Sequence, residues 1–381
     1  MKLFSHDDGS SSSSSSSNHT CPMPQDLSAE ASEPFAGDMT FHTFNKILSG
    51  SCAAFVCLAI FALMTMHATH FSNPARQIKI MRICVLLPIY GVLSFLAIAF
   101  PNSYVYLMAW VDVFQAIALC AFFLLLCDFV SPRQEERAIF FAKLQPKSKS
   151  SKPVDGLTWF KKKWIAVLQY PIVAFIDAVA TSITEAADIY CLESNKAYFG
   201  HVWLNVIRIL SVSVATFSIL MFYATLKPHI SQHKPLTKLI ALKLIVGLVF
   251  LENIIFTILR STSVLETTSK LTWSDVHMGI ETLIICLQLV PIACLFHYAY
   301  GIGPYRLSRH TPVDTHDYAT VDPNASILPQ GYQGGPLGIW AWFAMCNPLE
   351  DVRDVRDTFG MLNQAKHESR QILLNSPTGY P

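Results

Sequence analysis

Three carboxylates stand in one otherwise apolar stretch, Ala174–Cys191, which reads AFIDAVATSITEAADIYC. On a helix, Asp177, Thr181, Thr184, Glu185 and Asp188 fall within an arc of about 100°. A charged side chain facing lipid at mid-bilayer costs roughly 2.5–3.5 kcal/mol. We therefore expect this polar stripe to face the interior of a helix bundle, a water-filled cleft or a partner. For Asp188, which lies near the interface, the alternative is a solvated position.

The composition explains why lipid enters the argument. Of 381 residues 52% are hydrophobic and 14% are charged, against roughly 25% charged residues in soluble proteins. We predict an all-α membrane protein, a seven-transmembrane-helix bundle, because seven apolar runs approach the ~20 residues that cross a bilayer. Pro88 predicts a kink in the second run. The expected spans are Ile47–Met66, Ile83–Phe100, Tyr106–Val130, Trp164–Tyr190, Val202–Leu226, Leu239–Leu259 and Val276–Tyr300.

Other spans also carry polar side chains that could meet the stripe. They are Asp112 and Gln115 in the third span, Asn205 and Arg208 in the fifth, Lys243 and Glu252 in the sixth, and Glu281, Gln288 and His297 in the seventh. By depth we expect an ion pair between Glu185 and Arg208. Because acids outnumber cations, we interpret the set as a polar cavity or solute path. The alternative is that these groups only join helices through hydrogen bonds, worth about 0.6 kcal/mol each on average.

The loop charges predict an orientation. One set of connections carries most of the cations: Arg76, Lys79 and Arg82, then the run from Arg133 to Lys163, then Lys227, Lys234 and Lys238, then Arg306 and Arg309. The opposite set carries Lys46, Lys196, Arg260 and Lys270. By the positive-inside rule the N-terminus is lumenal or extracellular and the C-terminus cytosolic. Glycosylation is then expected at Asn18, whereas the sequon at Asn324 stays unmodified.

The remaining residue types favour no enzyme. Most cysteines lie in apolar runs, which indicates buried free thiols rather than a disulfide framework. His67 and His70 lack an evident third metal ligand. We find no P-loop, glycine-rich nucleotide loop or nucleophile–base arrangement, and expect no cofactor, no metal and no nucleic acid. A seven-span receptor is disfavoured, because the third span ends in Cys127-Asp128-Phe129 and the seventh lacks Asn-Pro-x-x-Tyr.

The two termini are expected to lie outside the bundle of residues 46–305. Residues 1–45 are Ser-rich and predicted to be disordered. We also predict disorder for 306–335, a flexible cytosolic linker, and for the C-terminal residues 364–381. In the linker, Asp317, Tyr318 and Val321 match the acid-led aromatic–aliphatic format that Atg8-like proteins bind by strand addition; the alternative is a solvated linker. Residues 336–363 are predicted to be interfacial, through Trp340 and Trp342, and then an amphipathic helix. Its apolar face would include Val352, Val355 and Phe359, covered by the membrane, the bundle's loops or a partner.

Several motifs together resemble one known family. They are PARQIKIMRICVLLPIYGVLSFLAIAFP after the first span, WLNVIRILSVSVATFSILMFY and KPLTKLIALKLIVGLVFLE in spans five and six, and FHYAYGIGPY at the end of span seven. This set is similar to the organic solute transporter alpha-subunit / transmembrane protein 184 family. GGPLGIWAWFAMCNP in the tail resembles fungal members in particular.

The resemblance implies two functions of different classes. Animal alpha subunits export bile acids and steroid conjugates with a small single-span subunit. Fungal and plant relatives are associated with the vacuolar membrane, and one binds an Atg8-like autophagy protein through its tail. We therefore expect a transporter, or a transport subunit, of a steroid- or lipid-like solute; the alternative is a vacuolar membrane scaffold. The plasma membrane and endoplasmic reticulum remain alternative locations, and a homodimer an alternative assembly.

Departures from the family pattern place bile-acid transport in doubt. Where the third span of relatives reads Arg-Asp-x-Tyr-Glu-Ala, this chain has Val111, Asp112, Val113, Phe114, Gln115 and Ala116. Glu252 stands where relatives often have Gln, and Ser131–Lys163 contains no cysteine.

Overall fold

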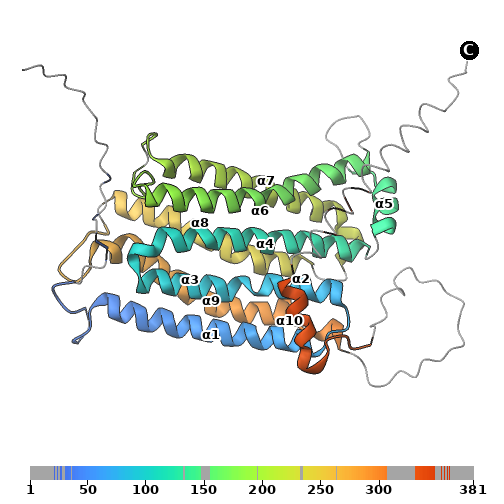
Figure 1. Cartoon of the computed structure of the whole chain (residues 1–381), viewed down its shortest axis with the longest axis horizontal. Coiled ribbons are helices and arrows are strands. Elements are labelled where there is room, and N and C mark those ends of the chain that lie inside the picture. The colour runs from blue at the N-terminus through green and yellow to red at the C-terminus, as the bar shows by residue number, and fades with distance from the viewer. Residues whose placement is uncertain are drawn as a thin grey trace, which may run out of the picture.

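The computed structural model describes residues 37–131, 134–146, 155–194, 196–231, 235–262, 264–306 and 331–347. It also describes residues 21, 24, 26–27, 31–35, 353, 356, 358 and 360. The regular elements of these residues are helices, and seven of them are long and apolar enough to cross a membrane (Figure 1). The predicted all-α, seven-span architecture is confirmed at that level.

The spans have these bounds. α1 is Phe41–Thr69; the second span joins α2 (Pro74–Cys84) to α3 (Leu86–Ala99); the third joins η1 (Pro101–Ser103) to α4 (Tyr104–Val130); α6 is Gly156–Ala186; α7 is Gly200–Ile230; α8 is Pro235–Ser261; and the seventh joins the π-helix η3 (Asp275–Gly279), α9 (Ile280–Ala299) and η4 (Gly303–Tyr305). Shorter helices are α5 (Gln134–Lys143), η6 (Pro336–Gly338) and α10 (Ile339–Cys346).

The second span begins at Pro74, nine residues before the expected Ile83. Its first helix carries Arg76, Lys79 and Arg82, which we had assigned to a loop; all three are buried within the fold. The predicted kink lies at Val85, between α2 and α3. Pro88 explains this position, because a proline cannot donate to the carbonyl four residues earlier and its ring displaces that carbonyl, which belongs to Cys84.

α6 ends at Ala186, four residues before the expected Tyr190. Its start is set by Asp155, whose carboxylate accepts hydrogen bonds from the backbone N–H groups of Leu157 and Thr158, an N-cap. Gly156 lies so close to the carbonyl of Phe141 that a Cβ would come within 2.1 Å of its oxygen. This contact fixes α5 against the first turn of α6.

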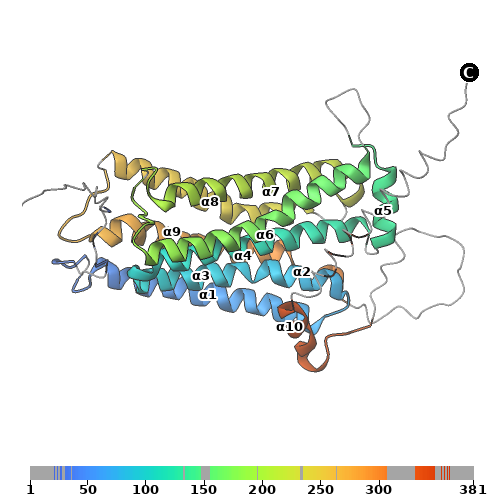
Figure 2. The same cartoon turned by 45° about the horizontal axis from the view of Figure 1, so that its top comes forward.

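α4 is the central helix. In its most apolar window 78% of the residues are buried inside the protein, against 39% for α1. α4 packs on α2 and α3 on one side and on α6 and α7 on the other, while α1, α3, α8 and α9 form a second group (Figures 1 and 2). Each side of the molecule therefore has its own helix–helix interfaces in which polar groups can be buried.

The two ends of the bundle differ. We call the end where α1 begins the amino end and the end where α9 finishes the carboxyl end. At the carboxyl end α5 inserts Phe141 between α6 and α7, with its ring stacked 4.0 Å from that of Phe160 and 5.9 Å from that of Phe222. α10 lies at the same end, across α1 and α2 (Figure 1).

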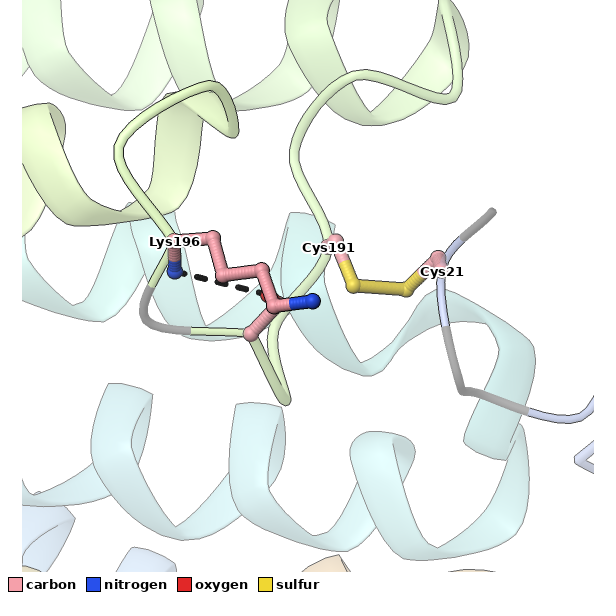
Figure 3. Close-up of a disulfide and its surroundings, with 4 residues drawn as sticks. Cys21, Cys191 and Lys196 are labelled. Carbon is pink, nitrogen blue, oxygen red and sulfur yellow. Dashed lines mark hydrogen bonds between the residues drawn. A yellow bond between two sulfur atoms is a disulfide. The ribbon is translucent and has the colours of Figure 1, made fainter. Parts of the chain in front are cut away.

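At the amino end a disulfide joins Cys21, in the N-terminal segment, to Cys191, in the α6–α7 loop (Figure 3). Leu27 N donates to Asn102 Oδ1 and Glu33 N donates to the carbonyl of Ser269, so this segment crosses three loops. The prediction of free thiols is confirmed for the cysteines in the apolar runs, of which Cys84, Cys127 and Cys286 are also buried as expected whereas Cys294 is exposed. The sequence did not predict the bond between Cys21 and Cys191, which lie outside those runs and share one end of the bundle.

Several predictions fall outside the described residues. These are the Ser-rich start of the chain, the glycosylation site Asn18, the linker residues Asp317, Tyr318 and Val321, and the helical residues Val352, Val355 and Phe359.

Candidate functional site

The polar stripe of α6 is buried over its first two members. Asp177 is 7% exposed and Thr181 is 4% exposed. Glu185 is half-buried in the last turn of α6. Asp188 lies beyond the helix with φ of 57° and is exposed, so the expectation that it continues the stripe was wrong. The buried part of the stripe faces α4 and α7, the helices on which α6 packs most extensively.

Arg208 on α7 reaches across to α4. Its Nη1 donates to Asp112 Oδ2 at 2.8 Å and its Nη2 donates to Asn205 Oδ1 at 2.8 Å. The expected partner Glu185 was wrong. Asn205 lies three residues before Arg208, one turn away on the same helix face, and holds the guanidinium in the orientation that meets α4.

Tyrosines complete this site, and the sequence interpretation missed them. Gln115 Nε2 donates to the hydroxyl of Tyr170 at 3.0 Å. Tyr90 on α3 and Tyr190 after α6 lie close enough to Asp112 and Arg208 to interact electrostatically with both. Burial raises the pKa of Tyr190 to about 12, so its hydroxyl stays protonated and can donate. Tyrosine in an apolar run is the signal that could have identified them, because a buried hydroxyl usually needs a polar partner.

We name Asp112, Gln115, Tyr170, Asp177 and Arg208 the Asp177 cluster. Asp177 lies within electrostatic range of both Arg208 and Asp112. Its Oδ1 is buried and has no hydrogen-bond partner within the described residues. Asp112 and Asp177 therefore both lie near the guanidinium of Arg208, but Asp112 is the one that forms an ion pair with it. This arrangement can bind a group that supplies a proton, a positive charge or a hydrogen-bond donor.

A second polar site joins α8 to α9. Gln288 Nε2 donates to Glu252 Oε1. Glu252 Oε2 is buried without a hydrogen-bond partner in the described part of the chain. Glu281, also buried, lies close enough for its charge to act on Glu252. The single interior that we expected for spans three to seven is therefore two sites, because α8 packs on α9 and not against the stripe of α6.

Two other residues in the predicted site lie apart from both acidic groups. Lys243 Nζ donates to Thr216 Oγ1 at 2.6 Å and so joins α8 to α7. His297 Nε2 lies 2.8 Å from the carbonyl oxygen of Ala59 on α1. Both contacts join helices, which is the alternative role that the sequence left open for each residue.

A third charged group, which we name the Asp128 cluster, lies at the carboxyl end. Asp128 accepts from Lys79 Nζ at 2.5 Å and from Arg137 Nη2 at 3.0 Å. Arg76 donates to the backbone carbonyl of Asp128 at 2.9 Å, and Arg137 to that of Ser131. These cations satisfy carbonyls at the C-terminal end of α4, where the helix dipole favours positive charge.

The two histidines that we considered as metal ligands bind backbone carbonyls. His67 Nε2 lies 2.7 Å from the oxygen of Tyr300, and His70 Nδ1 lies 3.0 Å from that of Met66. Gln77 then bridges the turn, donating to the carbonyls of both histidines. These contacts hold α1, α2 and the end of the seventh span together.

A small cavity lies at the amino end between α1, α3 and η3. Its volume of about 10 Å³ is close to the space of one water molecule. His42, Ala97, Asp275 and Thr282 are among its lining residues. It does not include Asp177.

Comparison with known proteins gives a family. The model of the family described as organic solute transporter Ostalpha matches residues 45–306. This range covers the seven spans, the Asp177 cluster and the Asp128 cluster.

The chain is also similar to curated proteins. It is 24% identical over 295 residues to a transmembrane protein 184 homolog of Dictyostelium discoideum, covering 73% of this chain and 54% of that protein. It is 26% identical over 305 residues to protein LAZ1 homolog 1 of Arabidopsis thaliana, covering 71% of this chain and 61% of that protein. The chain thus spans less than two thirds of the length of these relatives. No solved structure matches it.

Proposed function

The chain belongs to the organic solute transporter Ostalpha family, and on that premise we propose that it carries an organic solute across a membrane, as a transporter or as a subunit of one. The family is one of multi-pass membrane proteins and not of enzymes. The solute class that we propose is steroid- or lipid-like, which the family resemblance implies and which suits the apolar helices around the cluster.

The buried Asp177 carboxylate is the observation that carries this proposal. It lies between α6, α4 and α7, next to the Asp112–Arg208 ion pair, and has an oxygen without a hydrogen-bond partner in the described residues. Intramembrane carboxylates are costly and are found on substrate and proton pathways. Its neighbours Tyr170 and Gln115 add hydroxyl and amide groups of the kind that orient a solute in an apolar pocket.

The charge balance of the cluster restricts the solute. Asp112 and Asp177 carry two negative charges against one positive charge on Arg208, so an additional anion would be repelled. We propose that the group that binds at Asp177 is a hydroxyl, an amine or a proton that moves with the solute. A bile-acid carboxylate is disfavoured at this position for the same reason.

The test is solute flux in proteoliposomes that contain the full chain. A radiolabelled sterol and a radiolabelled steroid amine serve as probes. D177N is expected to reduce uptake at least ~10-fold, corresponding to ~1.4 kcal/mol or more of lost interaction, or to abolish its dependence on a pH gradient. D188N is the matched control, because Asp188 is an exposed acid just beyond the same helix. Equal uptake by wild type and D177N would remove Asp177 from the path.

We also propose that the amino end is lumenal or extracellular. The disulfide between Cys21 and Cys191 supports this orientation, because disulfides persist in oxidising compartments. This orientation agrees with the distribution of cations between the two sets of loops. Arg76, Lys79 and Arg82 no longer count in that distribution, because they lie in α2 and are buried. Glycosidase treatment tests it: a mass shift that is lost in N18Q supports the orientation, and one that is lost in N324Q reverses it.

A second candidate is a vacuolar scaffold that binds an Atg8-like protein through the cytosolic tail. The docking of α10 at the carboxyl end favours it, because this helix places Asn347 at the end of the bundle that we propose to be cytosolic. Two truncations test this candidate and show which segment of the tail binds the Atg8-like protein. Loss of binding after truncation at Asn347 assigns the site to the last residues, whereas loss only after truncation at Arg306 assigns it to the segment that contains Tyr318. Unchanged binding in both would exclude the tail.

A further inference from the structure

Residues 331–347, which we name the clip, fold back onto the bundle. They include η6 and α10, and α10 runs across the ends of α1 and α2 rather than along them (Figures 1 and 2). Because the seven spans cross the membrane, a helix that runs across them lies along the membrane plane. The contacts of α10 with α1 and α2 therefore determine its depth in the membrane.

The clip is firmly docked on one side. Arg82 of α2 donates to the carbonyls of Ala344, Met345 and Asn347, at 3.3, 3.0 and 2.6 Å. A guanidinium in this position caps the C-terminus of α10. The ring of Trp342 stacks on that of Phe61 of α1 at 5.1 Å, and Ala341 is completely buried.

Two glycines permit this close approach. Gly335 and Gly338 have φ of 67° and 81°, a region that glycine adopts without steric cost. A Cβ at Gly338 would come within 2.7 Å of Ala68 on α1, and one at Gly335 would overlap the ring of Trp340. The Gly-Gly-Pro-Leu-Gly sequence therefore sets the direction in which α10 leaves α1.

The outward side of the clip is apolar. Leu337 is 85% exposed, Trp340 is 63% exposed and Phe343 is 68% exposed. These side chains continue the exposed apolar surface of α1, which includes Leu58 and Phe61. That surface is the lipid-facing side of a membrane span, so the two form one continuous apolar surface.

The contact with Phe61 places the clip at lipid depth. α1 has 29 residues and is about 43 Å long, roughly 13 Å more than a hydrocarbon core of ~30 Å. Phe61 lies eight residues before the end of α1, which is about 12 Å at ~1.5 Å per residue. If the excess length is divided equally between the two ends, α1 extends about 6 Å beyond the hydrocarbon core at its C-terminal end. Phe61 then lies inside the hydrocarbon core, and Trp342, which stacks on it, lies at the depth of the acyl chains.

We propose that the clip is an in-plane membrane anchor, whose Leu337, Trp340 and Phe343 insert into the lipid of the leaflet at the carboxyl end. The occupant of this surface is the bilayer that the seven spans cross. Tryptophan and phenylalanine on the same face suit the boundary between acyl chains and headgroups.

The test is photocrosslinking of the full chain in native membranes. Benzoylphenylalanine is placed in turn at 340 and 343, on the outward side. Position 58 is the lipid-facing control, and position 306, an exposed residue beyond the seventh span, is the aqueous control. Phospholipid adducts at 340 and 343 are expected at a yield comparable to that at 58 and about tenfold above that at 306, because the boundary positions contact lipid.

Other outcomes would overturn the proposal. Adducts with a second copy of the chain or with another protein would make the outward face a protein interface. A yield as low as that at position 306 would place it in water. R82A releases the clip and is expected to lower the lipid adducts at 343, whereas K162A, at an exposed residue near the start of α6, is the control that leaves them unchanged. These measurements do not depend on any solute.

Discussion

Asp128 and Asp177 are both buried aspartates of membrane-spanning helices, but their surroundings differ. Asp128 is 2% exposed and accepts from two cations, Lys79 and Arg137. Asp177 is 7% exposed, and its Oδ1 accepts no hydrogen bond from the described residues. Arg208, the cation nearest to Asp177, is held by Asp112 and Asn205.

The difference indicates different roles. At the carboxyl end Asp128 binds Lys79 and Arg137, and these contacts join α2, α4 and α5, which we interpret as a structural role. In the Asp177 cluster the paired side chains are only partly buried, with Arg208 33% and Asp112 23% exposed, and one carboxylate is left over. Within the described residues Asp128 contacts two cations, whereas Asp177 keeps an oxygen without a hydrogen-bond partner; this contrast supports the proposal that Asp177 binds a group from outside the bundle.

The largest expected effect is that of D128N. The amide would remove the negative charge that Lys79 and Arg137 contact, and breaking a buried pair costs about 3–5 kcal/mol. We expect a large loss of folded protein and of thermal stability, measured by fluorescence-detected size-exclusion chromatography after heating in detergent. E136Q is the control, because Glu136 is an exposed acid at the start of α5. A wild-type melting curve for D128N would show that the cluster is not structural.

The disulfide is expected to have the next largest effect. It closes a loop with a sequence separation of 170 residues, and such cross-links typically stabilise by about 2–4 kcal/mol. C21S and C191S, alone or together, should lower the melting temperature by the same amount, because either change removes the same bond. Reducing agent should have this effect on wild type and none on the variants. A different result for the double variant would mean that a cysteine has another role.

A smaller effect is expected for the Asp112–Arg208 pair. Because the pair joins α4 to α7 through side chains that are only partly buried, it should contribute about 1 kcal/mol, within the range of polar contacts between membrane helices. A double-mutant cycle with D112N and R208Q measures this coupling energy from melting curves. A coupling as large as that of Asp128 with Lys79 would place the pair in a dry interior and remove the contrast between the two clusters.

The sequence predicted the membrane spans well because hydropathy reports burial in lipid directly. It missed the first half of the second span for the same reason. Arg76, Lys79 and Arg82 lower the hydropathy of α2, and their partners Asp128 and Ala344 are distant in the chain. A pattern along one helix cannot show that its charges are paired by another.

The sequence could predict where a polar side chain lies along its own helix, but not which neighbouring helix it contacts. Helical periodicity correctly placed Asp177 and Thr181 on one buried face of α6. Depth alone suggested Glu185 as the partner of Arg208, yet Arg208 pairs with Asp112 on α4, although α7 has its more extensive interface with α6. Which helices meet is set by their packing, and this is also why Glu252 and Gln288 form a separate site.

The smallest effect on stability is expected for D177N, and this prediction separates the two clusters most sharply. The amide has the shape of the carboxylate and removes a buried charge with no hydrogen-bond partner on one oxygen in the described residues. Neutralising such a group costs little and can stabilise the fold. The melting temperature of D177N should therefore equal or exceed that of wild type, while uptake of the sterol or steroid amine falls. A destabilisation comparable to that of D128N would instead make Asp177 a structural residue, and the proposed solute path would have to be sought at Glu252.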